Sequence, residues 1–273
     1  MSFPTLGISA GTGMAGLCRD RGPFEERVYR FSPYGVPVRY ALTEIGGVPA
    51  VFTSRHTAVG PPESSAAHLM PEPVIDFLAR EIGIRKVFAT SAVGGIGNRI
   101  TDLHVGTLVC PHDYRDFTGG LHTLSRPGVF DHLEVFHRAP AQPFCPELRR
   151  LLCQTPGIQN GAKLAIPVKG NRYETDCEIG DLTTLGYDLV GMPTTVPEAI
   201  CAREAAIHYA VVCCVTDLPG REHVSADAIV RVMHEQQELI YTAFAHAAQQ
   251  LAGLESPWPC DCENDPSVYS LID

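Results

Sequence analysis

The sequence predicts an α/β fold built as one domain. Short β-like runs alternate with helical patterns along most of the 273 residues, which is typical of a sheet flanked by helices. No internal repeat and no linker rich in Pro, Gly or Ser divides the chain. Hydrophobic residues make up 45% and charged residues 19%, which provides enough apolar material for a substantial core. We therefore expect residues 1–254 to form a single domain.

The first half of the chain contains mainly strand patterns. Gly46 and Gly47 separate two of them, which predicts a hairpin. Gly83 follows a helical pattern and is a natural helix end. The expected elements are a strand at 5–9, hairpin strands at 38–43 and 48–53, a helix at 74–82 and a buried strand at 87–90.

The second half repeats the alternation and ends in a long helical pattern. Ser225 is a natural N-cap, and apolar residues keep helical spacing from there to Leu251. Residues 255–273 hold Pro, Cys and acidic residues without periodicity, so we expect a loose, acidic tail. The other expected elements are helices at 146–152, 175–185 and 197–206, and strands at 164–168, 188–191 and 208–215.

The charge balance excludes several classes of partner. The chain has 21 Lys plus Arg against 31 Asp plus Glu, a net charge of −10. Such an acidic protein is a poor partner for nucleic acid or an anionic membrane. No apolar run approaches the roughly 20 residues that span a bilayer. The N-terminal residues lack the basic and apolar regions of a signal peptide, so we expect a cytoplasmic protein.

The ten cysteines lie mostly in apolar segments, as Cys213 and Cys214 do, which is typical of reduced, buried cysteines. Cys260 and Cys262 form a C-D-C sequence without a second pair at zinc spacing. The sequence therefore favours the absence of a metal site, with a metal site at this C-D-C sequence as the less favoured alternative.

Polar side chains follow the predicted strands, where open α/β sheets bind ligands. Hydroxyls, one Arg, one His and one carboxylate are suited to an oxyanion beside a heterocycle. These residues are Thr12, Arg55, His56, Ser91, Thr194 and Asp217.

Each candidate also has a purely structural interpretation. Arg55 and His56 are suited to a phosphate, but a surface Arg beside a structural His fits the pattern too. Glu174 is suited to a ring N–H and Tyr173 to stacking on a base, whereas helix capping explains the same segment. A partly desolvated Asp217 would have a raised pKa and share a proton with a purine nitrogen, whereas an Asp after a strand more often caps a loop.

Seven strings in order make the chain similar to the trimeric purine nucleoside phosphorylase family, and within it to the 5'-methylthioadenosine phosphorylase branch. They run from Gly11 to Asp217 and so cover most of the chain. The strings are G-T-G-M, R-H, T-S-A-V-G-G, H-R-A-P-A-Q-P-F-C-P, G-N-R-Y-E-T, G-M-P-T-T-V-P-E-A-I-C-A-R-E and V-T-D.

The resemblance implies a phosphorylase/hydrolase-like fold with a mixed, twisted, partly barrel-like central sheet, and a homotrimer or a dimer of trimers. It implies phosphorolysis of a purine nucleoside, with inorganic phosphate as co-substrate and no cofactor. Asp217 would bond purine N7 and assist departure of the base. The implied phosphate ligands are Thr12, Arg55, His56, Ser91 and Thr194. The implied nucleoside contacts are Ala92, Met192, Tyr173, Glu174, His223 and Val224, with His137 reaching a neighbouring subunit's site.

The resemblance leaves the substrate open between several candidates. Asp217 favours an amino-purine, with 5'-methylthioadenosine or another 5'-deoxy-5'-modified adenosine as the expected nucleoside. Pro219 stands where the amino-purine branch has a second Asp, so a 6-oxopurine nucleoside or methylthioinosine is the alternative. A nucleosidase that uses water is a further enzyme alternative. A non-catalytic nucleoside-binding homologue is the alternative of another class.

Overall fold

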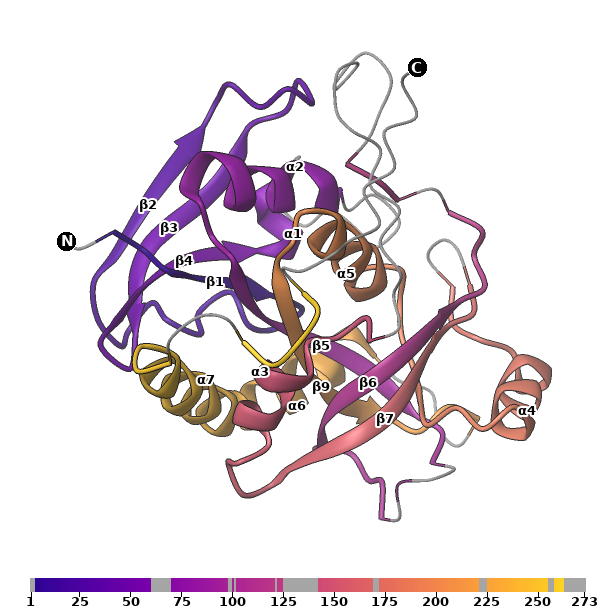
Figure 1. The fold of residues 1–273 in the computed structure, drawn as a ribbon. Helices are drawn as coiled ribbons and strands as arrows, with labels where there is room; N and C mark the ends of the chain where they lie inside the picture. The colour runs from indigo at the N-terminus through magenta and orange to yellow at the C-terminus, as the bar shows by residue number, and fades with distance from the viewer. Residues whose placement is uncertain are drawn as a thin grey trace.

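A mixed central sheet organises the computed structural model (Figure 1). The structure describes residues 3–59, 70–97, 100, 102–120, 122–124, 142–168, 172–220, 225–254 and 258–262. Within them the sheet has nine strands: β1 (Leu6–Ala10), β2 (Phe24–Tyr29), β3 (Val38–Ile45), β4 (Val48–Ser54), β5 (Lys86–Gly95), β6 (Leu108–Asp116), β7 (Ile158–Ile166), β8 (Leu189–Val190) and β9 (His208–Asp217). The described helices are α1 (Arg55–Ala58), α2 (Pro71–Asp76), which continues as a π-helix over Phe77–Ile82, α3 (Pro146–Leu152), α4 (Asp176–Thr184), α5 (Thr195–Glu204), α6 (Ala226–Glu235) and α7 (Gln237–Leu251).

Part of this sheet closes into a barrel. The strand order is β2-β3-β4-β1-β5-β8-β7-β6-β9, and β5 also pairs with β9. The strands β5, β8, β7, β6 and β9 therefore form a ring, while β1 to β4 extend from it as an open sheet. Parallel pairs, such as β5 with β9, occur beside antiparallel pairs, such as β5 with β8. The prediction of a mixed, partly barrel-like sheet is confirmed.

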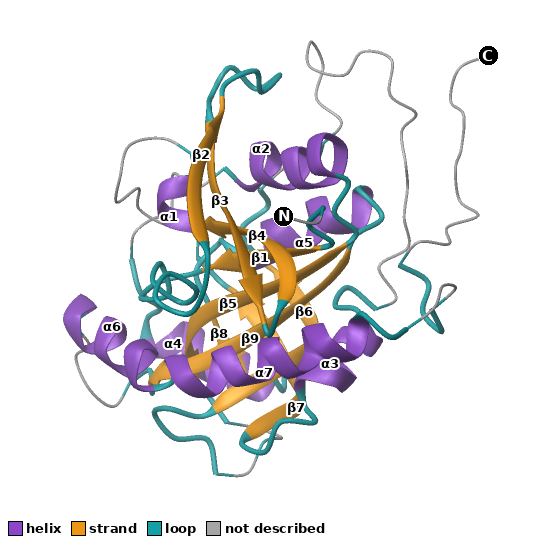
Figure 2. Ribbon diagram, turned by 90° about the vertical axis from the view of Figure 1, so that its left-hand side faces the viewer, coloured by secondary structure: helices purple, strands orange, loops and turns teal. Residues whose placement is uncertain are grey.

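Helices cover both faces of the sheet (Figure 2). Alternate residues of β5 belong to the buried clusters on its two faces. Phe88 of β5 packs against Phe244 of α7, with ring centroids 5.1 Å apart. Val87 and Ala89, its neighbours, belong to the opposite buried cluster, with Ile75 of α2. This period of two is the side-chain alternation of a strand buried on both faces. None of the described helices has the length and hydrophobicity needed to cross a membrane.

Most expected elements are present within a residue or two of their predicted bounds. The hairpin turns at Gly46 and Gly47, whose φ angles of 57° and 80° favour glycine. The helix at 175–185 begins after a capping box, in which Thr175 and Glu178 bond each other's backbone N–H groups.

The single long helix predicted after Ser225 is wrong, because the structure has two helices that meet at Gln236. Gln236 has φ −92° and ψ −3°, and its N–H bonds the carbonyls of Val232 and His234. No Gly or Pro marks this break, and buried residues such as Met233 and Ile240 keep helical spacing across it.

The loose tail expected after residue 254 is wrong for residues 258–262. Trp258 is only 9% exposed, and its ring centroid lies 4.5 Å from that of His208. The Lys86 ammonium lies over the same indole at 4.8 Å. One aromatic ring and two cysteines hold residues 258–262 against the domain, although the expected tail as a whole is acidic. The other residues of the expected tail, 255–257 and 263–273, lie outside the described part of the chain.

Candidate active site

One pocket collects most of the polar residues that the sequence singles out. Its volume is about 250 Å³, slightly below the roughly 300–1,000 Å³ typical of small-molecule sites. The predicted residues that line it are Thr12, Arg55, His56, Ser91, Ala92, Tyr173, Glu174, Met192, Thr194 and Asp217. His137, His223 and Val224 lie outside the described residues.

Arg55 is a buried, paired residue and not the surface Arg of the structural alternative. Its Nε and Nη2 atoms donate to the carboxylate of Glu198 at 2.9 and 2.8 Å, and its Nη1 donates to the Thr90 carbonyl at 3.0 Å. These bonds use three of the five N–H groups of a guanidinium. Arg55 therefore presents a fixed positive group to the pocket.

Glu198 holds Arg55 in place from the first turn of α5. It also accepts hydrogen bonds from Ser9 Oγ at 2.8 Å and from Tyr209 Oη at 2.7 Å. Burial by itself raises the pKa of Glu198, but the Arg55 charge and these donors hold that pKa below its usual range. The pair is thus ionised, and β1, β9 and α5 all contribute to it.

The loop after β1 approaches Arg55 closely enough to require glycine. A Cβ on Gly11 would lie 2.6 Å from the Thr90 carbonyl oxygen and 2.7 Å from Arg55 Nη1. The Gly11 N–H donates to Thr90 Oγ1 at 2.8 Å. The next residue, Thr12, has its Oγ1 3.0 Å from His56 Nε2. The loop therefore places a hydroxyl and an imidazole beside the guanidinium.

Asp217 is the last residue of β9 and a carboxyl of this pocket. Burial raises its pKa, and a hydrogen bond that its Oδ1 accepts from Thr216 Oγ1 at 3.0 Å partly offsets this. This direction agrees with the raised pKa that the sequence leads us to expect. A carboxyl in this state is suited to share a proton with a ring nitrogen.

Tyr173 and Glu174 lie near Asp217 in the segment before α4. Burial raises the pKa of Glu174, and the nearby charge of Asp217 raises it further. Tyr173 lines the pocket but is 55% exposed. Thr175 caps α4, as the structural interpretation predicts, while its two predecessors line the pocket. The contacts of Tyr173 and Glu174 with a base stay predictions.

Ser91 differs from its expected place, because it lies within β5 and not after it. The strand continues to Gly95 by pairing with β9 and then with β8. The register against β9 shifts between Val93 and Gly94, where the strand reaches the pocket. Ser91 lines the pocket although strand pairing continues past it.

The sequence did not indicate several residues that line the pocket or, like Glu198 through Arg55, support it. Glu198 carries no signal beyond an acidic residue in the first turn of a helix. Ala226, Ile229 and Val230 of α6 line the pocket, but their pattern indicates only an amphipathic helix. The pocket thus combines donors for an oxyanion, a carboxyl for a heterocycle and an apolar wall.

A model of the phosphorylase superfamily matches residues 12–252. The chain belongs to the phosphorylase superfamily. The match includes every described pocket residue named above, so the pocket is part of the superfamily domain.

Curated relatives in the superfamily carry two kinds of name. A protein of Methanothermobacter thermautotrophicus named probable S-methyl-5'-thioinosine phosphorylase is 29% identical, over 95% of this chain and 88% of its own length. One of Methanopyrus kandleri with the same name is 34% identical, over 78% of each chain. The S-methyl-5'-thioadenosine phosphorylase of Thermofilum pendens is 31% identical, over 86% of this chain and 87% of its own length.

Solved structures of the phosphorylase superfamily share the fold. The methylthioadenosine phosphorylase of Schistosoma mansoni, in complex with adenine, has a TM-score of 0.77 and 22% identity. The superposition covers 92% of this chain and 93% of that one. The single α/β domain is therefore that of a known phosphorylase structure.

Proposed function

We propose that this phosphorylase superfamily member cleaves 5'-methylthioadenosine, or another 5'-deoxy-5'-modified adenosine, with inorganic phosphate. The products are the free base and a 5-modified ribose-1-phosphate. One observation carries the proposal: a single pocket holds the partly buried carboxyl of Asp217 together with the basic and hydroxyl groups of Arg55, His56 and Thr12. Relatives named for methylthioadenosine phosphorolysis support it.

Phosphate binds at the basic part of this pocket in our proposal. Arg55 donates with the N–H groups that Glu198 and Thr90 leave over, while the hydroxyls of Thr12, Ser91 and Thr194 and the His56 ring add hydrogen bonds. A phosphate held in line with the anomeric carbon supplies proximity and stabilises the oxocarbenium-like transition state electrostatically.

Asp217 assists departure of the purine. The leaving base gains negative charge as the glycosidic bond breaks, and a protonated carboxyl at N7 neutralises it. Burial of Asp217 favours that protonated form. Glu174, Tyr173 and Ala92 complete the base end of the pocket in this proposal.

The apolar wall supports an apolar 5' substituent. Met192 lies under the ribose in our proposal, and Ile229 and Val230 line the same pocket. Apolar side chains stabilise a methylthio group, whereas they leave a 5' hydroxyl without a partner. The proposed contacts of His137, His223 and Val224 stay predictions.

Methylthioinosine is the second candidate substrate. Two relatives carry the thioinosine name, and Pro219 replaces the second acidic residue of the amino-purine pattern. Rates with methylthioadenosine, adenosine, inosine and methylthioinosine, each with and without phosphate, test both candidates. We expect phosphate-dependent turnover that is fastest with methylthioadenosine. Faster turnover of methylthioinosine would select the second candidate, and turnover without phosphate would overturn phosphorolysis.

We further propose a homotrimer, or a dimer of trimers, that needs no organic cofactor and works in the cytoplasm. The family resemblance supports the assembly, and reduced buried cysteines such as Cys213 and Cys214 support the location. Light scattering coupled to size-exclusion chromatography tests the assembly. A mass of one or two chains would contradict it.

A further inference from the structure

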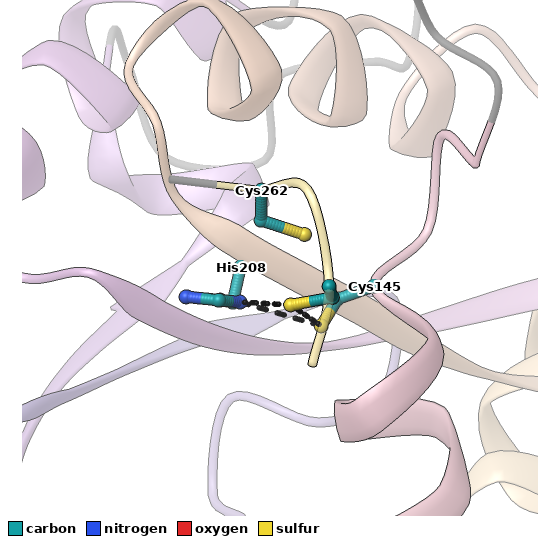
Figure 3. Close-up of side chains that lie close together, drawn as sticks. Cys145, His208 and Cys262 are labelled. Atoms are coloured by element: carbon teal, nitrogen blue, oxygen red, sulfur yellow. Dashed lines mark hydrogen bonds between the residues drawn. The ribbon is translucent and has the colours of Figure 1, made fainter. Parts of the chain in front are cut away.

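Three cysteines and one histidine from three distant segments meet at the far end of β9 from Asp217. Cys145 directly precedes α3, His208 is the first residue of β9, and Cys260 and Cys262 belong to the packed segment 258–262. Their ligand atoms all lie within 4.8 Å of one another. Figure 3 shows the side chains of Cys145, His208 and Cys262 converging on one point.

Three of the separations between these atoms are close to those of a tetrahedral zinc site, and all four atoms lie within 4.8 Å of one another. The Sγ atoms of Cys145 and Cys260 are 3.9 Å apart, and they lie 3.4 and 3.3 Å from His208 Nδ1. With Zn–S of about 2.3 Å and Zn–N of about 2.0–2.1 Å, a regular tetrahedron places two sulfurs about 3.8 Å apart and a sulfur about 3.6 Å from a nitrogen.

We propose that Cys145, His208, Cys260 and Cys262 bind one structural Zn²⁺ ion. The three thiols bind as thiolates and release their protons to solvent, while the imidazole binds through Nδ1. Four protein ligands leave no open position for water or substrate, which is the arrangement of a structural site and not of a catalytic one.

Backbone hydrogen bonds to the sheet fix two of the ligands independently of the segment 258–262. The Cys145 N–H donates to the Tyr209 carbonyl at 2.8 Å, and the His208 N–H donates to the Arg85 carbonyl at 2.8 Å. Cys145 and His208 are each 1% exposed. The ion would therefore join the segment 258–262 to the start of β9 and the start of α3.

The surroundings suit the charge of such a site. Three thiolates and one Zn²⁺ ion carry a net charge of −1. Lys86 is the strand partner of His208 on β5, and its ammonium lies over Trp258, which packs on the His208 ring. The Lys86 ammonium and the Trp258 ring thus lie next to the ligand His208.

The site is separate from the active site. Asp217 ends the strand that His208 begins, and ten residues of β-strand span about 30 Å. Loss of the metal should therefore change stability and the packing of the segment, without touching the residues that line the pocket.

Metal content of the purified protein is the first test. The full chain, prepared with a non-chelating reductant, should contain one Zn per chain by mass spectrometry of the elements. C262S and C260S should lose that zinc, whereas C177S, at an exposed cysteine of α4, should keep it. Zinc content equally low in wild type and in the tail variants would overturn the proposal.

Cobalt and the single tryptophan give readouts that need no variant. Co²⁺ exchanged into the wild-type protein should show thiolate-to-cobalt charge-transfer absorption. Trp258 is the only tryptophan, so a chelator should shift the emission to the red and added Zn²⁺ should reverse the shift. Absence of both signals would overturn the proposal, as would a disulfide joining two of these three cysteines in the native protein.

Discussion

At the scale of single residues, Asp217 combines a raised pKa with a place in the pocket. We expect D217N to lower kcat/KM for methylthioadenosine by about 10²–10⁴-fold, the usual contribution of a general acid. Burial raises the pKa, so the folded protein holds this proton more tightly than the unfolded chain, and stability falls as pH rises through that pKa. D217N removes a carboxyl whose charged form burial disfavours, and should therefore melt no lower than wild type at neutral pH.

Asp181, an exposed residue of α4, provides the control for that substitution. D181N should leave both activity and melting temperature unchanged. Steady-state kinetics and thermal unfolding across pH measure the two effects. Full activity of D217N would remove Asp217 from the mechanism, and a large loss of stability at neutral pH would show a structural role instead.

Glu198 makes a second prediction at this scale. Its side chain and that of Arg55 are 2% and 6% exposed. We expect E198Q to lower the free energy of unfolding by about 3–5 kcal/mol, because it leaves a buried guanidinium without a counter-charge. The exposed Arg19–Glu26 pair, with side chains 55% and 66% exposed, is the control, and E26Q should cost less than about 1 kcal/mol. If E198Q and E26Q lowered the free energy of unfolding in urea by the same amount, burial would not account for the contribution of the Arg55–Glu198 pair.

The sequence predicted those pocket residues whose type and place in a short motif indicate a ligand-binding role. Arg55 and His56 follow β4, Asp217 ends β9, and all three carry groups that bind anions or heterocycles, so position and residue type agreed. Glu198 was missed because its role depends on Arg55, which lies 143 residues away in the chain. No local pattern encodes a pair at that separation.

At the scale of elements, the turn after β1 controls the position of Arg55. A Cβ on Gly11 would meet the Thr90 carbonyl and Arg55 Nη1 at 2.6 and 2.7 Å. We expect G11A to displace the guanidinium and to raise the KM for phosphate at least tenfold, since hydrogen bonds of a charged group depend steeply on geometry. Initial rates at varied phosphate concentration measure this.

Gly16 in the same loop provides the matched control. A Cβ there would have only Gln237 Nε2 as a neighbour, at 3.9 Å. G16A should leave the KM for phosphate unchanged. If G11A and G16A had the same KM for phosphate, close packing of this turn would not affect phosphate binding.

Elements with strong periodicity were predictable, and those that depend on tertiary pairing were not. α3 has the predicted bounds because Pro146 and the following apolar spacing mark it locally. β6 was missed because Pro111 and several charged residues interrupt its pattern, and it is a strand only through pairing with β7 and β9. The exposed edge strand β2 lacks a buried face that a pattern would reveal.

At the scale of the whole molecule, the closed ring predicts where the fold is most resistant to opening. β5 and β9 pair with each other inside the barrel and are buried along most of their lengths. We expect their amide hydrogens to exchange only on global unfolding, whereas those of β2 exchange by local opening. Hydrogen-exchange mass spectrometry measures this. Equal protection of β2 and β9 would contradict it.

The pocket is lined by residues from Thr12 to Val230, so almost the whole chain must be in place before it exists. A ligand that binds only the native pocket stabilises the native state by mass action. Above Kd, this stabilisation grows with the logarithm of the ratio of the ligand concentration to Kd. Phosphate and nucleoside would thus act as folding ligands as well as reactants. A cell that depletes either one would leave this enzyme closer to its unfolding threshold and more open to proteolysis.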